Sequence, residues 1–224
     1  QKYPVLILMH GANDDYDSWL LEEHEYGSGT LSGKALLDRM IELGYCRPCI
    51  VVSPAFETRT IQGITAAVYQ MRDELREYIL PWLTEHYSTY AENNSLEAVA
   101  AARDWFALGG LSDGALFVYE GGMRYNFDLF GNYVAFSGNG EPWKTVSAIQ
   151  SDEWAELPIQ CLFTGAGGDT DIQQHYTEIG YDYFIENDSR FRAEENAWHV
   201  DVTGGHVWKV WLTGLCNALP LLFP

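Results

Sequence analysis

The sequence has few basic residues and no long apolar run. Only 13 of its 224 residues are lysine or arginine, against 32 aspartates and glutamates, so its formal net charge at pH 7 is −19. A charge of this sign repels nucleic acid and anionic lipid, and we expect neither a nucleic-acid nor a membrane partner. No apolar stretch approaches the roughly 20 residues that a membrane-spanning helix needs. At 47% apolar residues, the composition is that of a globular protein.

Cysteine is also scarce, and its placement does not indicate redox or metal chemistry. Cys46 and Cys49 form a C-x-x-C motif, but it precedes the strand-like run 50–52, whereas a redox motif belongs at the start of a helix. No second C-x-x-C is present to complete a zinc site. We expect the cysteines to be buried thiols, although the sequence alone also allows one disulfide.

Strand-like and helical patterns alternate along the whole chain. Short apolar runs predict strands at 5–9, 50–52, 105–108, 133–136, 158–164 and 198–202. Helical spacing predicts helices at 30–43, 66–87, 172–187 and 208–219, the second kinked by Pro81. This alternation predicts one α/β domain over residues 1–224, with a mainly parallel sheet and helices on both faces. The first residues contain no secretory signal and enter a strand at once, so we expect a mature or trimmed chain.

The stretch Gly110-Leu111-Ser112-Asp113-Gly114 matches the G-x-S-x-G nucleophile elbow. An apolar, strand-like run precedes it and a helix-compatible run follows it, which is the strand–turn–helix context that the motif requires. The glycines on either side of the serine remove side chains that would collide across the sharp turn. We therefore predict Ser112 as a nucleophile, with the Asp113 N–H directed at the carbonyl oxygen under attack.

A second loop of the same kind follows the first predicted strand. His10-Gly11-Ala12 resembles the H-G loop that supplies the other oxyanion-hole N–H in lipases and esterases, so the Ala12 amide is the candidate donor. We interpret His10 as a structural histidine that holds this loop. Tyr16 and Trp19 follow it, near the strand ends where such folds bind substrate.

An acid and a histidine complete the chain order of an α/β-hydrolase triad: Ser112, Asp169, His206. Each lies just after a predicted strand, and parallel strands bring these loops to one edge of the sheet. Histidine is suited to take the serine proton, because an imidazole ordinarily titrates near neutral pH. Asp171 competes with Asp169 for the role of the acid. We prefer Asp169, because Asp171 is well placed to cap the helix that follows.

The chain resembles the feruloyl esterase modules of clostridial xylanases, in carbohydrate esterase family one of the esterase-D-like α/β hydrolases. The similarity covers most of the chain and is carried by five stretches: Tyr3 to Gly11, Tyr87 to Glu92, Gly109 to Gly114, Gly204 to Trp208 and Ala218 to Phe223. The resemblance implies an α/β-hydrolase fold, secretion, and hydrolysis of feruloyl esters on arabinoxylan through an acyl-enzyme, without a metal or other cofactor. It also implies Ser112, Asp169 and His206 as the triad and the Ala12 and Asp113 amides as the oxyanion hole. The expected partner is a feruloylated polysaccharide or oligosaccharide, and the module is expected to be part of a larger enzyme.

The sequence departs from this family at two points. Methionine usually follows the serine, where this chain has Asp113, and a carboxylate there opposes a developing oxyanion unless it faces solvent or a cation. The family also has strands before the His-Gly strand.

Two alternatives stay open: an acetylxylan or siderophore esterase of the same fold, and a degenerate hydrolase that only binds decorated glycan. Trp208, Tyr16 and Trp19 are the candidate substrate contacts.

Overall fold

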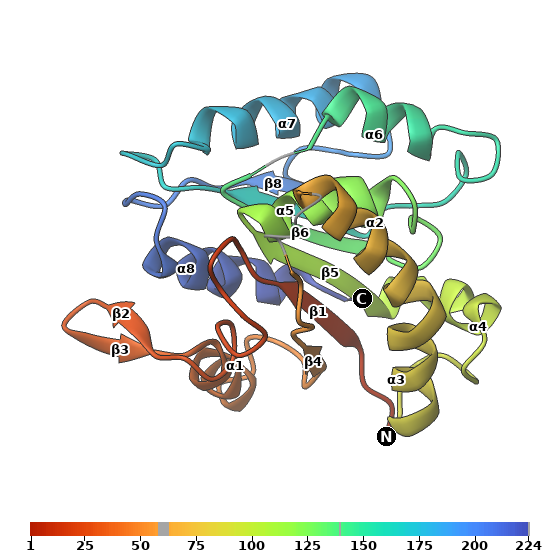
Figure 1. Cartoon of the computed structure of the whole chain (residues 1–224), viewed down its shortest axis with the longest axis horizontal. Helices are drawn as coiled ribbons and strands as arrows, with labels where there is room; N and C mark the ends of the chain where they lie inside the picture. The colour runs from red at the N-terminus through yellow and green to blue at the C-terminus, as the bar shows by residue number, and fades with distance from the viewer. Residues whose placement is uncertain (58–62, 139, 224) are drawn as a thin grey trace.

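The computed structural model describes residues 1–57, 63–138 and 140–223. Its centre is a six-stranded sheet in the order β4-β1-β5-β6-β7-β8 (Figure 1). The strands are β1 (Val5–Met9), β4 (Ile50–Val52), β5 (Phe106–Leu111), β6 (Asn132–Phe136), β7 (Cys161–Gly165) and β8 (Ala197–His199). Every neighbouring pair is parallel, so the loops that leave the strands gather at one edge of the sheet. The predicted α/β class is confirmed.

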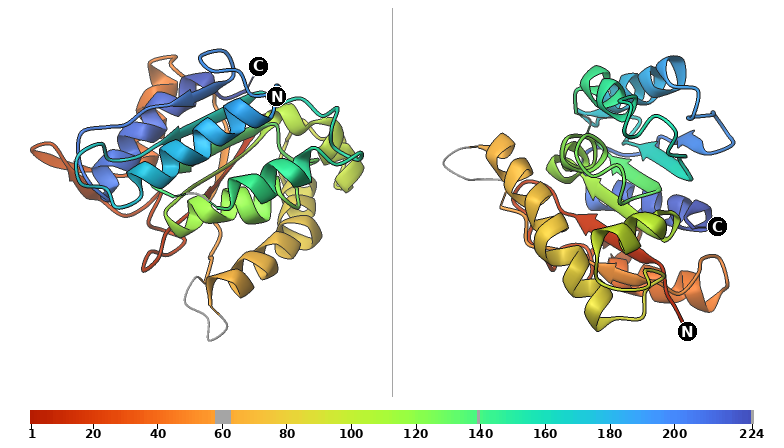
Figure 2. Two further views of the ribbon diagram at one scale, coloured as in Figure 1. Left: turned by 90° about the horizontal axis from the view of Figure 1, so that it is seen from above. Right: turned by 90° about the vertical axis from the view of Figure 1, so that its right-hand side faces the viewer.

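Helices cover both faces of this sheet, as the views in Figure 2 show. One face packs against α1 (Gly33–Glu42) and α8 (Trp208–Ala218). The other packs against α2 (Ile64–Glu74), α3 (Leu80–His86), α4 (Leu96–Ala101), α5 (Asp113–Phe117), α6 (Pro142–Ile149) and α7 (Gln174–Asn187).

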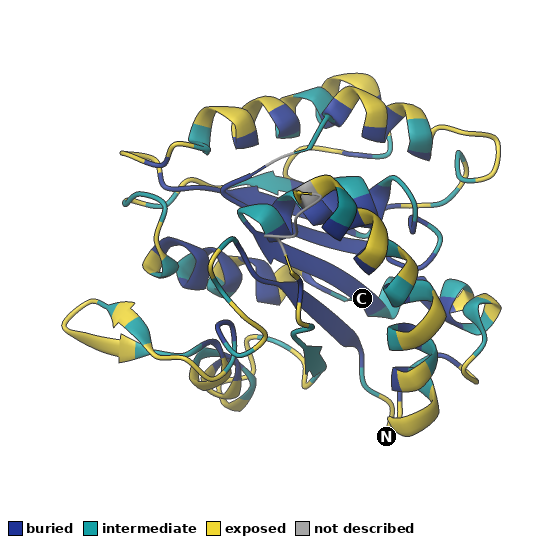
Figure 3. Cartoon of the chain, viewed as in Figure 1, coloured by how far each residue is buried: buried dark blue, intermediate teal, exposed yellow. Residues whose placement is uncertain are grey.

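The continuous apolar run of β1 is explained by these two layers. Leu6 and Leu8 join the α1 and α8 side of the core, whereas Val5, Ile7 and Met9 join the opposite side. All five are fully buried, because side chains alternate between the two faces of a strand and both faces are covered. In Figure 3 the central strands β1, β5, β6 and β7 are accordingly dark, while the outward sides of the helices are exposed.

The predicted helix at 30–43 begins later than expected. Residues His24–Tyr26 (β2) and Gly29–Leu31 (β3) form an antiparallel hairpin that the sequence analysis missed, and it projects from the body of the molecule in Figure 1. The helix then starts at Gly33, because the Ser32 hydroxyl accepts the Ala35 N–H at 3.2 Å and caps it. Thr30 thus lies in a strand.

The predicted helix at 66–87 is interrupted just before Pro81. A π-helical segment, η1 (Leu75–Ile79), separates α2 from α3, and the Leu80 N–H donates to the Leu75 carbonyl. Proline lacks an N–H and crowds the preceding turn, so the helix accommodates it with wider winding at this point. A second π-helical segment, η3 (Val118–Met123), extends α5.

The four cysteines are free thiols. Burial raises the pKa of Cys49 to about 12 and also raises that of Cys46. A thiol with a raised pKa is a poor nucleophile, which agrees with the structural interpretation of the C-x-x-C motif. Across the described ranges, no helix combines the length and the apolar character needed to span a bilayer.

Candidate active site

Ser112 lies at a strained turn between β5 and α5. Its φ of 52° and ψ of −115° are unusual for a residue other than glycine. Two hydrogen bonds fix the turn: the Ser112 N–H donates to the Phe136 carbonyl at 2.9 Å, and the Ser112 carbonyl accepts the Leu116 N–H at 3.0 Å. The neighbouring strand and the new helix therefore hold the serine in place.

Both glycines of the motif are required by the closeness of the backbone. A Cβ on Gly110 would lie 2.4 Å from the carbonyl carbon of Gly114. A Cβ on Gly114 would lie 2.3 Å from the Met9 carbonyl oxygen. The predicted collision across the turn is confirmed for Gly110. For Gly114 the reason is different, because α5 packs directly on the end of β1.

The loop after β1 lies against the serine. A Cβ on Gly11 would be 3.1 Å from the Ser112 Cβ, so the two loops touch at this point. Within the described residues, the neighbouring Ala12 amide donates no hydrogen bond. Asp113 is the first residue of α5 and is half-buried. The structure thus brings the loop that carries Ala12 against Ser112, and Asp113 follows Ser112 at the start of α5.

His206 pairs with Asp171. Its Nδ1 lies 2.9 Å from the Asp171 Oδ1, and the carboxylate is completely shielded from solvent while the imidazole is 27% exposed. The contact on Nδ1 leaves Nε2 as the nitrogen that can act on a serine. Among the described residues Ser112 Oγ makes no hydrogen bond to His206, and such bonds are often long before substrate binds.

Asp171 is held by a full set of donors. Besides His206, it accepts hydrogen bonds from the Ser137 hydroxyl at 2.5 Å, the Gly167 N–H at 3.1 Å and the Gln173 N–H at 2.9 Å. Burial alone would raise the pKa of this carboxyl group, but these hydrogen bonds outweigh it and lower the pKa to about 2. The group is therefore a carboxylate throughout the neutral range.

The preference for Asp169 as the partner of His206 is wrong in this structure. Its Oδ2 instead accepts the Gly204 N–H at 3.1 Å, and its own N–H donates to the Gly204 carbonyl at 3.2 Å. Asp169 fastens the acid loop to the histidine loop. The capping argument failed because a carboxylate accepts several hydrogen bonds: Asp171 Oδ1 takes both the Gln173 N–H and His206.

Two residues of this network were missed in the sequence. Ser137 follows β6 with a φ of 51°, and its hydroxyl accepts the Trp211 Nε1–H at 2.7 Å while donating to Asp171. The Trp211 ring meets His206 edge to face at 4.9 Å. A polar residue directly after a strand of the parallel sheet was the available signal for Ser137. Trp211, one turn into a helix, has no comparable signal.

The three candidate substrate contacts have different environments. Trp19 is fully buried, and its indole N–H donates to the Met9 carbonyl at 3.0 Å, so its proposed role as a substrate contact is wrong. Trp208 is half-buried and stacks on His24 at 3.9 Å. Tyr16 is 55% exposed. Trp208 and Tyr16 stay candidates.

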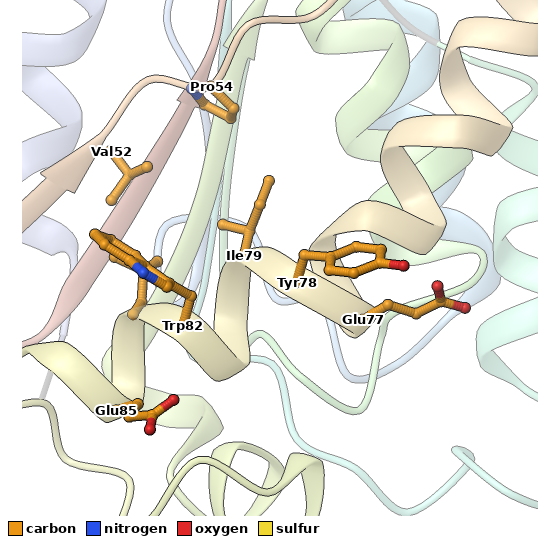
Figure 4. Close-up of a pocket in the computed structure, with 8 residues that line it drawn as sticks. Val52, Pro54, Glu77, Tyr78, Ile79, Trp82 and Glu85 are labelled. Atoms are coloured by element: carbon orange, nitrogen blue, oxygen red, sulfur yellow. The ribbon is translucent and has the colours of Figure 1, made fainter.

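An apolar groove of about 500 Å³ lies away from the serine. It follows the outer strand β4 and the η1–α3 helix, with Val52, Ile79 and Trp82 facing one another across it (Figure 4). A smaller hollow of about 190 Å³ lies beside the loop after β1, lined by His10, Asp14 and Phe56 among others. Of these two hollows the smaller adjoins the candidate site, and a further hollow of about 490 Å³ is lined by Val207 and Trp208 beside His206.

Comparison with known proteins places this fold. No protein-family profile matches the chain. A feruloyl esterase module from Clostridium thermocellum, solved as a serine-to-alanine mutant with sinapinate, superposes with a TM-score of 0.82 at 22% identity, covering 100% of this chain and 78% of that one. A CE1 ferulic acid esterase from Anaeromyces mucronatus, solved with ferulic acid, gives 0.73 at 20% identity, over 100% and 80%. An enterobactin esterase from Shigella flexneri gives 0.66 at 15%, over 97% and 52%.

One curated sequence shares a shorter stretch. Endo-1,4-beta-xylanase Y of Acetivibrio thermocellus is 31% identical over 116 residues, which is 52% of this chain. The match covers only 10% of that much longer enzyme.

The architecture and these comparisons define the class by its fold, which is the α/β-hydrolase fold. Within that class the chain resembles the feruloyl esterase modules, and the resemblance seen in the sequence is confirmed.

Proposed function

We propose that this chain is a secreted serine carboxylesterase that hydrolyses feruloyl and related hydroxycinnamoyl esters of plant cell-wall arabinoxylan. The observation that carries the proposal is the contact between His206 and the buried Asp171 carboxylate, which lies at the same sheet edge as the strained Ser112 turn. Similarity to feruloyl esterase modules supports the substrate class, and the partial match to a xylanase supports a place in a larger, multimodular enzyme.

In the proposed reaction, Ser112 Oγ attacks the ester carbonyl while His206 Nε2 takes its proton. The oxyanion that forms accepts hydrogen bonds from the Ala12 and Asp113 amides. The Asp171 carboxylate keeps the other imidazole proton on Nδ1 and stabilises the imidazolium. His206 then protonates the departing sugar oxygen, and the acyl group stays on Ser112.

The second half of the reaction repeats these roles with water. His206 removes a proton from water as the water oxygen attacks the acyl carbonyl. It then returns that proton to Ser112 Oγ as the acyl–oxygen bond breaks and ferulate leaves. Trp208 and Tyr16 are proposed to contact the acyl group or the sugar. No step requires a group outside the chain, the ester and water.

The test is hydrolysis of methyl ferulate and of p-nitrophenyl acetate by the wild type and by Ser112→Ala. We expect the wild type to hydrolyse both, to prefer the ferulate ester in kcat/KM, and to lose both activities in the variant. Labelling of Ser112 by a fluorophosphonate checks the nucleophile independently.

Two outcomes would change the proposal. Hydrolysis of the short ester alone would keep the esterase and reject the feruloyl specificity. Binding of feruloylated oligosaccharide without any hydrolysis, and with Ser112 unlabelled, would identify a glycan-binding homologue instead.

A further inference from the structure

The peptide that joins Gly11 to Ala12 is held in one orientation. Its carbonyl oxygen, on Gly11, accepts hydrogen bonds from His10 Nδ1 at 2.9 Å and from the Asp14 N–H at 3.3 Å. The Phe56 N–H donates to His10 Nε2 at 3.1 Å, which leaves the ring proton on Nδ1 to make the first of these bonds. In a trans peptide the N–H points opposite to the C=O, so these bonds also fix the direction of the Ala12 N–H.

The Asp14 side chain extends this restraint to a second loop. Its Oδ2 accepts the Gly11 N–H at 3.2 Å. The carboxylate also faces the Trp208 side chain, whose indole N–H can only donate and which helps to lower the pKa of Asp14. Burial raises the pKa of Asp14, while the bonds to Gly11 and Trp208 and the nearby His10 act in the opposite direction. Asp14 thus connects the loop after β1 to a residue two positions beyond His206.

Trp208 continues the connection to the acid and the histidine. Its ring contacts Trp211 edge to face at 5.4 Å, and Trp211 in turn contacts His206 and donates to Ser137. Ser137 is a hydrogen-bond donor to Asp171. An unbroken set of contacts therefore runs from the candidate oxyanion loop to the Asp171–His206 pair.

On the basis of the function proposed above, we infer that Asp14 is a positioning residue that fixes the Ala12 N–H relative to His206 by bonding both Gly11 and Trp208. Removal of its negative charge leaves one of the two N–H donors without a good acceptor. The Gly11–Ala12 peptide can then turn. The Ala12 N–H would thereby leave hydrogen-bonding distance of the oxyanion.

The test compares Asp14→Asn with Asp15→Asn, a neighbouring exposed carboxylate, on methyl ferulate. We expect Asp14→Asn to lower kcat by about 10- to 100-fold with little change in KM, because a shifted donor affects the transition state more than the bound ester. Asp15→Asn should match the wild type in both constants. Trp208→Phe removes the other end of the link, and combined with Asp14→Asn it should cost less than the product of the two single effects.

A second measurement tests the contact between Asp14 and Trp208 independently of catalysis. The indole ¹⁵N–¹H resonance that Trp208→Phe deletes should shift in Asp14→Asn and stay in place in Asp15→Asn, while thermal unfolding shows that each variant folds. An active wild type whose Asp14→Asn variant keeps its kcat, or keeps the indole resonance in place, overturns the positioning role alone. A wild type that hydrolyses no ester refutes the proposed function and the positioning role together.

Discussion

The Asp171 carboxylate accepts four hydrogen bonds, and only one of them comes from His206. The other three fix its orientation, so the imidazole meets a carboxylate that is already aligned. Asp169 lies two residues away, and among the described residues its hydrogen bonds join it to the backbone of Gly204 alone. The two aspartates should therefore respond very differently to the same substitution.

We predict that Asp171→Asn lowers kcat for methyl ferulate by roughly 10⁴, because an amide at this position selects the wrong imidazole tautomer and cannot stabilise the imidazolium. Asp169→Asn should lose only a few-fold, because its amide oxygen can still accept the Gly204 N–H. Steady-state kinetics of both variants decide this, and equal losses would contradict the assignment of Asp171.

The same carboxylate makes the stability of the protein depend on pH. Its pKa falls from the ordinary 3.8 to about 2 in the folded chain, so it stabilises the fold above pH 3.8 and loses that contribution as the pH falls toward 2. The shift corresponds to about 2 kcal/mol, of which roughly half should be lost between pH 5 and pH 3.

Urea unfolding of the wild type and Asp171→Asn at pH 5 and pH 3 measures this contribution. The free energy of unfolding should fall by about 1 kcal/mol more in the wild type than in the variant over that interval. A parallel decline in both proteins would show that Asp171 does not titrate as described.

At the scale of elements, the turn between β5 and α5 depends on space that only glycine leaves. We predict that Gly114→Ala destabilises the protein by about 3 kcal/mol, because the added Cβ would lie 2.3 Å from the Met9 carbonyl oxygen and α5 would have to move off β1. Ser112 would move with the helix, so hydrolysis should fall as well.

Gly29→Ala is the matched control for this change. Gly29 lies in the exposed strand β3, has an ordinary φ, and a Cβ there would have no atom within 4 Å. Its stability should equal or slightly exceed that of the wild type, because alanine restricts the unfolded chain. Thermal unfolding of both variants tests the pair, and similar midpoints would contradict the packing described here.

The sequence predicted those elements whose pattern is set by burial on both faces. The apolar runs of β1, β6 and β7 identify strands because helices cover each side of the sheet. The β2–β3 hairpin was missed because none of its strand residues is buried, and a short strand without a buried face leaves no periodic pattern. The motif located Ser112 and His206, but the choice between Asp169 and Asp171 depends on which way each side chain points within one short loop. The spacing in the sequence carries no information on that.

At the scale of the whole molecule, the net charge of −19 acts on the product of the proposed reaction. A feruloyl ester is neutral, whereas the ferulate that leaves the site is an anion. The field of the protein should therefore weaken binding of the product and leave binding of a neutral ester unaffected.

We predict that ferulate becomes a stronger inhibitor as salt is added. Raising the ionic strength from about 0.01 M to about 0.15 M shortens the Debye length from about 30 Å to about 8 Å, which screens most of the repulsion. The inhibition constant of ferulate should fall several-fold, while KM for methyl ferulate stays nearly constant as the neutral control. Initial rates with added ferulate at the two ionic strengths measure both quantities. If the inhibition constant does not change with salt, then local contacts rather than the charge of the whole molecule govern how the product leaves.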